Sequence, residues 1–135
     1  MRRIALVVAV LGALAAGTAD ARVAVQAGPA AVGWTSNVFV SPTRNIHCRY
    51  FPGKKLMACT TQNDDFMTAV TLWGKAYHRQ YTYPFSFPDG PRLEYGDTWK
   101  ASGRFKCWSK TSGMTCESLK TSHGFFINRD SYDTW

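Results

Sequence analysis

The sequence has few acidic residues and only one long apolar run. Nine Asp and Glu residues stand against 16 Lys and Arg residues among 135, so the formal charge is +7 at pH 7. After the apolar run near the start, every later apolar stretch is interrupted within a few residues by polar residues or proline. Because a membrane-spanning helix needs about 20 apolar residues, we expect no transmembrane segment after processing. The net positive charge of the chain favours partners that carry negative charge.

The chain also lacks the short motifs of common catalytic sites. It has no G-x-S-x-G nucleophile elbow, no H-E-x-x-H helix and no glycine-rich phosphate loop. The four cysteines do not form the close C-x2-C pairs that bind zinc. Asp64 and Asp65 form a lone acidic pair without the alternating oxygen ligands of a calcium loop, and this pair is more typical of a helix start. We therefore expect no cofactor, no metal and no catalytic residue.

The first residues have the features of a secretory signal peptide. Two arginines precede an apolar run over residues 4–16, which is too short for a comfortable membrane anchor. Ala19 and Ala21 then supply the small-x-small pattern that signal peptidase accepts. We expect residues 1–21 to be a signal peptide cleaved before Arg22, and the protein to be secreted or periplasmic.

The mature chain has the features of one small basic domain. Cleavage removes two basic residues and one acidic residue, which leaves a formal charge of +6. Residues 22–36 are rich in Ala and Gly and are expected to form a flexible arm. Residues 37–135 have the length of a single domain with a modest core. We expect this domain to be a monomer.

All four cysteines fall in this domain, and an even number in an exported chain predicts disulfides. Cys48 and Cys59 flank the turn sequence Pro-Gly-Lys-Lys, while Cys107 and Cys116 flank Lys-Thr-Ser-Gly. Such residues reverse the chain, so each pair predicts a β-hairpin closed by a local bridge. Four cysteines allow three pairings, and bridges that join one hairpin to the other are the alternative.

The two predicted hairpins form a weak internal repeat. Residues 45–48 correspond to 104–107, and residues 57–59 correspond to 114–116. In each strand the cysteine shares a face with an apolar residue two positions away, while charged residues at the alternate positions face outward. This pattern predicts a half-buried sheet.

The remaining strands are short. We predict them at residues 38–40, 81–87, 93–99 and 125–127. Residues 66–77 fit either a strand or a short helix. The predicted fold class is all-β, with one short helix as an option, in a small antiparallel sheet or barrel stapled by two disulfides.

Four segments of the chain resemble a family of small exported bacterial domains of unknown function. They are residues 39–48, 93–96, 113–116 and 123–129. Members of that family tend to read F-x-S-P-S-G-N-I-x-C, L-x-Y-G, G-V-T-C and G-H-G-F-x-L-S-R. The chain departs from the pattern at Arg44 and Ser122, where the family prefers glycine. The resemblance covers residues 38–132 and implies export, one Cys-bridged domain and no assigned activity.

Basic and aromatic residues are mixed in the second half of the chain. Arg104, Lys106 and Trp108 occupy alternate positions of one predicted strand and would form a stripe, while His123 and Arg129 flank the last predicted strand. Cations bind phosphates or carboxylates, and aromatic faces stack on bases or sugar rings. We take these five as candidate partner-binding residues. They favour a non-catalytic binding module for an acidic envelope polymer, nucleic acid or a secreted protein.

Two other functions stay open at this point. A small secreted hydrolase such as a ribonuclease needs a general base, a general acid and a cation for the phosphate. Residues of suitable type are His47, His78, His123, Asp64, Asp65, Glu94 and Glu117. An inhibitor of a secreted enzyme would show the same composition. The aromatic residues of segment 77–87 fit either a core or a groove.

Overall fold

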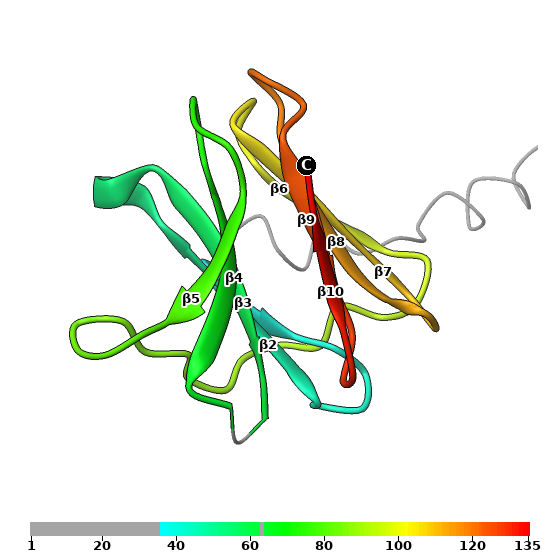
Figure 1. Ribbon diagram of the computed structural model, residues 1–135. Coiled ribbons are helices and arrows are strands. Elements are labelled where there is room, and N and C mark those ends of the chain that lie inside the picture. The colour runs from blue at the N-terminus through cyan, green and yellow to red at the C-terminus, as the bar shows by residue number, and fades with distance from the viewer. Residues whose placement is uncertain (1–35, 63) are drawn as a thin grey trace, which may run out of the picture.

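The computed structural model describes residues 36–62 and 64–135; the predicted signal peptide and all but the last residue of the predicted arm lie outside them. Two antiparallel five-stranded sheets face each other (Figure 1). The first contains β1 (Val38–Val40), β2 (Ile46–Phe51), β3 (Leu56–Thr61), β4 (Phe66–Thr71) and β5 (Tyr77–Gln80). The second contains β6 (Thr98–Ala101), β7 (Phe105–Lys110), β8 (Gly113–Ser118), β9 (Gly124–Ile127) and β10 (Tyr132–Thr134). The all-β prediction is confirmed.

Helical structure is minimal in the described part of the chain. A single 3-10 turn, η2 (Pro52–Lys54), lies in the β2–β3 connection, where Pro52 supplies a preset φ. No helix of the described residues has the length and apolar character needed to cross a membrane.

The second sheet repeats the first strand for strand. Each sheet is a meander in which spatial neighbours are also neighbours in the sequence. Cys48 lies opposite Cys59 between β2 and β3, and Cys107 lies opposite Cys116 between β7 and β8. The register therefore makes β1 to β5 of the first sheet equivalent, in order, to β6 to β10 of the second sheet. The repeat predicted for two hairpins extends to two whole sheets.

Both disulfides lie in the core between the sheets. The bridges are local to each hairpin, as predicted, and all four cysteines are fully buried. The Sγ atoms of Cys59 and Cys116 are 4.0 Å apart. Phe39 and Trp99, which pair with the first cysteine of each sheet, contact each other with ring centroids 5.2 Å apart. Equivalent positions of the two sheets thus meet across the core.

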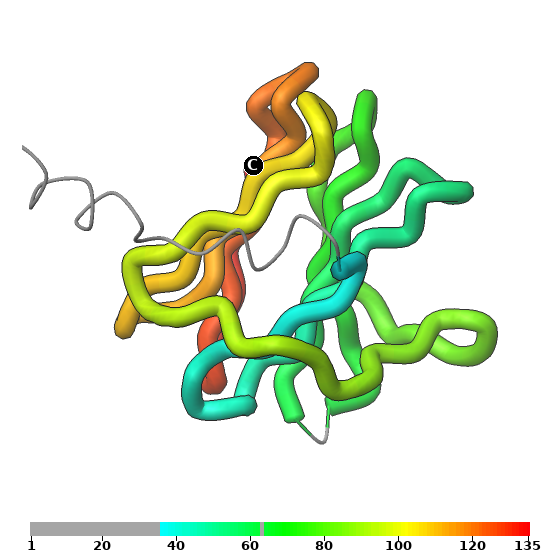
Figure 2. The backbone as a smooth tube through the Cα atoms, turned by 180° about the vertical axis from the view of Figure 1, so that it is seen from behind, coloured from blue at the N-terminus to red at the C-terminus, as the bar shows by residue number. Residues whose placement is uncertain are grey.

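The outer face of the first sheet is also buried, which corrects the prediction of a half-buried sheet. Ala58 and Ala69 lie side by side at its centre and form a shallow floor. Segment 81–87 covers this floor with the rings of Tyr81, Phe85 and Phe87. Figure 2 shows the chain after β5 continuing from this sheet across one side of the molecule to the second sheet.

Segment 81–87 is not a strand, contrary to the sequence prediction. Tyr83 is 94% exposed, so the aromatic residues do not share one face as alternation in a strand would require. Pro84 has no backbone N–H to donate to a neighbouring strand. Tyr81, Phe85 and Phe87 therefore pack inward as an irregular cover, while Tyr83 points to solvent, and the segment forms no strand ladder.

Two further local predictions are corrected, and one strand was not predicted. Only Thr98 and Trp99 of the strand expected at 93–99 lie in a strand, β6, because Gly96 adopts a φ of 89° and turns the chain before them. Asp64 precedes a strand and not a helix: its carboxylate accepts a hydrogen bond from the backbone N–H of Phe66, the first residue of β4. Strand β10 has no counterpart among the predicted strands, because its three residues lack an apolar alternation.

Candidate functional site

The predicted stripe of Arg104, Lys106 and Trp108 is divided between two places. Lys106 and Trp108 extend from β7 onto the outer face of the second sheet, where Lys106 Nζ lies 5.4 Å from the centre of the Trp108 ring. Arg104 belongs to the turn before β7, and its guanidinium donates to the Tyr50 hydroxyl, 3.0 Å away. Glu117 lies directly opposite Lys106 on β8. This face therefore carries both signs of charge.

The other two candidates lie at the two ends of β9. The carbonyl of His123 accepts a hydrogen bond from the Ser118 N–H in the turn that follows β8. Arg129 lies in the β9–β10 turn with its Nε 3.3 Å from the carboxylate of Asp130. The structure does not gather the five candidate residues into one site.

A different set of cations lies over aromatic rings on the outer side of the first sheet. The Arg49 guanidinium is 4.8 Å from the centre of the Phe51 ring. Lys54 Nζ and the Arg79 guanidinium lie 5.4 and 5.9 Å from the centre of the Phe85 ring. These distances fall within the range of cation–π attraction, about 6 Å. We call these five residues the basic–aromatic face.

None of the three cations of this face forms an ion pair with a residue of 36–62 or 64–135. The two ion pairs of that part of the chain lie elsewhere, at Arg44–Asp89 and Arg129–Asp130. Lys54 and Arg79 are exposed, and Arg49 is half-buried. The positive charge of this face is therefore available to an external anion.

Local contacts fix the geometry of the face. Arg49 donates to the hydroxyl and to the carbonyl of Ser86, at 2.8 and 3.2 Å, and so holds segment 81–87 against the sheet. A groove of about 350 Å³ runs beside Arg49, Phe51 and Lys54. Sequence reasoning missed this face because its members come from β2, η2, β5 and segment 81–87. The aromatic alternation near Arg79 was the one local signal.

His47 and His78 line separate depressions. Asp64 borders two depressions, one lined by His47 and the other by His78. Both oxygens of Asp64 accept hydrogen bonds within their own turn. His123 lies on the second sheet, in the turn between β8 and β9. In the part of the chain that the structure describes, no three His, Cys, Asp or Glu residues are grouped to hold a metal ion.

His78 connects the outermost strands of the two sheets. Its ring stacks on Tyr132 of β10, with centroids 3.7 Å apart, and on Phe66, at 5.3 Å. Its Nδ1 lies 2.8 Å from the hydroxyl of Thr68. Burial lowers the pKa of His78 from its ordinary value of 6.5, and the charge of Asp64 opposes this shift. The packing therefore favours the neutral ring and gives His78 a structural role.

The four segments that resemble a family of small exported domains occupy β1–β2, the connection before β6, β8 and β9 with its following turn. Membership of that family stays a prediction. Compared with protein-family models, curated proteins and solved structures, the chain matches none.

Proposed function

We propose that the protein is an exported, non-catalytic binding module that holds an acidic polymer of the cell envelope on the basic–aromatic face. The carrying observation is a group of three cations around Phe51 and Phe85, whose ring centroids are 5.2 Å apart; within residues 36–62 and 64–135 these cations have no acidic partner. Fixed cations along a groove attract a chain of anionic groups, and binding releases the counterions of that polymer.

The arrangement of the rings favours an acidic glycan or a polyol phosphate over nucleic acid. Lys54 and Arg79 both lie over the Phe85 ring, and Phe51 meets Phe85 edge to face. Single-stranded nucleic acid gains much of its affinity from stacking bases on open aromatic rings. A face whose rings are covered by cations offers charge and little stacking surface.

The proposed location outside the cytoplasm is supported by the two buried disulfides, since such bridges persist in oxidising compartments. It also agrees with the signal peptide predicted at residues 1–21. N-terminal sequencing of the exported protein should begin at Arg22. Recovery of the full-length chain from the medium or envelope would contradict this assignment.

Salt-dependent binding tests the proposed surface. We would titrate the protein with purified teichoic acid and with a single-stranded oligonucleotide at several ionic strengths. Lys54→Gln and Arg79→Gln should each weaken teichoic-acid binding and flatten the salt slope by about one unit for each phosphate that is no longer neutralised. Both side chains are exposed, so the variants should fold normally.

Two matched controls locate the effect. Lys120→Gln removes an exposed cation from the β8–β9 turn and should leave the slope unchanged. Lys106→Gln tests the stripe predicted from the sequence. If the salt slope of teichoic-acid binding changes with Lys106→Gln and not with Lys54→Gln or Arg79→Gln, the binding surface lies on the second sheet. Tighter binding of the oligonucleotide than of teichoic acid would make nucleic acid the partner.

A further inference from the structure

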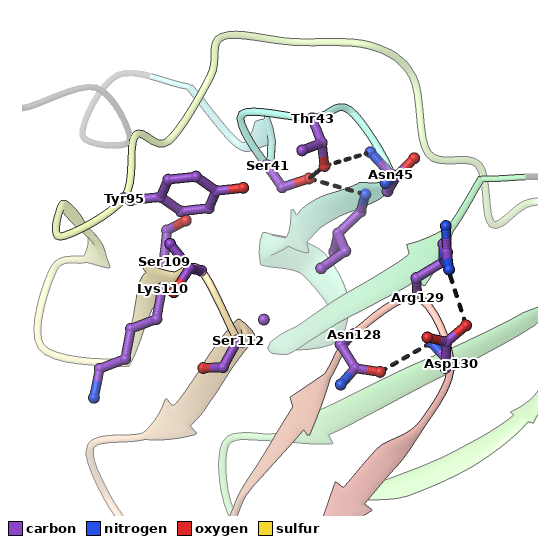
Figure 3. Close-up of a pocket in the computed structure, with 13 residues that line it drawn as sticks. Ser41, Thr43, Asn45, Tyr95, Ser109, Lys110, Ser112, Asn128, Arg129 and Asp130 are labelled. Atoms are coloured by element: carbon purple, nitrogen blue, oxygen red, sulfur yellow. Dashed lines mark hydrogen bonds and ion pairs between the residues drawn. The ribbon is translucent and has the colours of Figure 1, made fainter.

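A polar cleft of about 280 Å³ lies between the ends of the two sheets, apart from the basic–aromatic face. Its walls are the β1–β2 turn, the β7–β8 turn, the β9–β10 turn and the loop that carries Tyr95 (Figure 3). Apart from Ile46 and Gly113, every lining residue has a polar or charged side chain. The cleft is therefore suited to a small ligand rich in hydrogen-bonding groups.

The cleft gathers parts of the sequence that are distant from each other. Each of the four segments singled out by the sequence analysis contributes to it: residues 39–48 supply Ser41, Thr43, Asn45 and Ile46, residues 93–96 supply Tyr95, residues 113–116 supply Gly113, and residues 123–129 supply Asn128 and Arg129. Figure 3 shows the Tyr95 hydroxyl directed toward Ser41. The four segments therefore meet at this cleft. None of the residues that they contribute to it belongs to the basic–aromatic face.

Ser109 is the buried polar residue of this cleft. It is 1% exposed, and its Oγ has no hydrogen-bond partner among the described residues. Its backbone N–H donates to the Asp97 carbonyl and its carbonyl accepts from Gly96, so only the hydroxyl is unsatisfied. Buried hydroxyls without a partner are rare, because they lose the hydrogen bonds of water without replacement. A ligand in the cleft would supply the missing partner.

The equivalent position in the first sheet shows how such a cleft can be closed. Ser109 and Tyr50 each lie two residues after the first bridged cysteine of their sheet, so the repeat equates them. At the opposite end of the sandwich, the Tyr50 ring packs against Trp99 and Phe105, and its hydroxyl accepts a hydrogen bond from the Arg104 guanidinium. The cavity there is about 150 Å³. At the other end the equivalent position carries the smaller serine, and the cleft there is about 280 Å³.

We propose that this cleft binds one neutral sugar ring, with Ser109 as a buried hydrogen-bond partner and Tyr95 as the stacking surface. Tyr95 is 45% exposed at the cleft, and an aromatic ring beside hydroxyl and amide groups matches the two sides of a sugar. Two basic residues, Lys110 and Arg129, and one acidic residue, Asp130, line the rim; Arg129 is paired with Asp130, so a single positive charge, that of Lys110, is left there, and the polar lining is otherwise neutral. The volume lies just below the range of drug-sized ligands, about 300–1,000 Å³, which fits a single ring.

Amide chemical shifts test this proposal with glucose, galactose, mannose and N-acetylglucosamine as separate probes. At least one sugar should shift the amides of Ser109, Ser112 and Gly113 with millimolar affinity. That affinity should be the same at low and high salt, which separates the cleft from the basic–aromatic face. Loss of teichoic-acid binding in Lys54→Gln would leave sugar binding intact.

Variants of two cleft residues make the test specific. Ser109→Ala should weaken sugar binding about fivefold to tenfold while leaving the protein equally or more resistant to denaturant, because it removes an unsatisfied hydroxyl. Tyr95→Ala should abolish binding, and the matched control Tyr83→Ala, at a tyrosine 94% exposed outside the cleft, should not. Ser109→Tyr should narrow the cleft and weaken sugar binding, because the cavity beside Tyr50 is only about 150 Å³.

Three results would overturn the assignment. The first is that no sugar of the panel shifts the cleft amides. The second is equal binding by the wild type, Ser109→Ala and Tyr95→Ala. The third is a crystal structure, obtained after soaking with sugar, in which the cleft holds no sugar and an ordered water is bound to Ser109 Oγ. That result would mean that solvent alone satisfies the hydroxyl.

Discussion

Removal of either disulfide should destabilise the domain by a similar amount, because the two bridges occupy equivalent positions. We consider one variant with Cys48→Ala and Cys59→Ala and another with Cys107→Ala and Cys116→Ala. The bridges close loops with sequence separations of 11 and 9. Loop-closure entropy for such lengths is about 3 kcal/mol each, and removal of two buried sulfur atoms adds roughly 1–2 kcal/mol. We expect a total of about 4–5 kcal/mol per bridge.

The two effects should not be additive. The Sγ atoms of Cys59 and Cys116 are 4.0 Å apart, so each bridge forms part of the packing around the other. Neighbours of this kind couple by about 0.5–3 kcal/mol. The free energy of unfolding of a small domain is about 5–15 kcal/mol. Each variant that keeps one bridge should therefore fold, while the variant without both bridges should be only marginally stable.

Equilibrium unfolding in guanidinium chloride, followed by near-UV circular dichroism, measures these free energies. The reasoning would be refuted by a destabilisation below about 1 kcal/mol for either bridge, because loop closure alone predicts more. A large difference between the two bridges would refute the equivalence of the sheets. Peptide mapping of the native protein should find only the two local linkages.

Three further changes probe the contacts between and within the sheets. The stabilisation from neutral His78 should be complete above pH 6.5, the ordinary histidine pKa of the unfolded chain, and should decrease as the pH falls from there through the lower pKa of His78 in the folded protein. The reason is that the unfolded ring binds a proton more readily than the folded one. Unfolding curves recorded across that pH range should show a weaker pH dependence for His78→Phe. Ser118→Ala should cost about 1–3 kcal/mol by removing the buried 2.7 Å bond to the Leu72 carbonyl that joins the sheets, and Ser122→Ala, at an exposed serine, is the control in the same denaturant assay. Gly124→Ala should lower the melting temperature, because a Cβ would lie 2.5 Å from the backbone oxygen of Cys116, and an unchanged melting temperature would contradict that close approach.

The hairpins could be predicted from the sequence because their information is local. Cys48 and Cys59 are joined by a chain that contains its own turn, so the alternation of apolar residues decides which face is buried. The cover of the first sheet could not be predicted in this way. Phe85 packs against Phe51, and the small residues Ala58 and Ala69 that make room for it belong to other strands. An aromatic alternation in the sequence is the same for a strand and for an irregular cover.

The candidate sites were less predictable than the fold. The alternation of Arg104, Lys106 and Trp108 assumes that the strand begins at Arg104, whereas β7 begins at Phe105 and the preceding turn directs the Arg104 guanidinium to Tyr50. A single residue at a strand boundary thus changes the face on which a cation lies. The basic–aromatic face and the cleft depend on pairing between distant strands, which composition and spacing do not specify.

The two proposed sites have a common origin in the repeat. Both sheets share the bridged hairpin, and the register gives each position of one sheet a counterpart in the other. Arg49, which anchors segment 81–87, corresponds to Trp108, whose ring lies beside Lys106 on the outer face of the second sheet. Tyr50, which fills one end of the core, corresponds to Ser109, which leaves a cleft at the other end. Positions that are equivalent in the scaffold but different in side chain are therefore the places where binding surfaces form, since the buried cysteines and their apolar neighbours already satisfy the requirements of the fold.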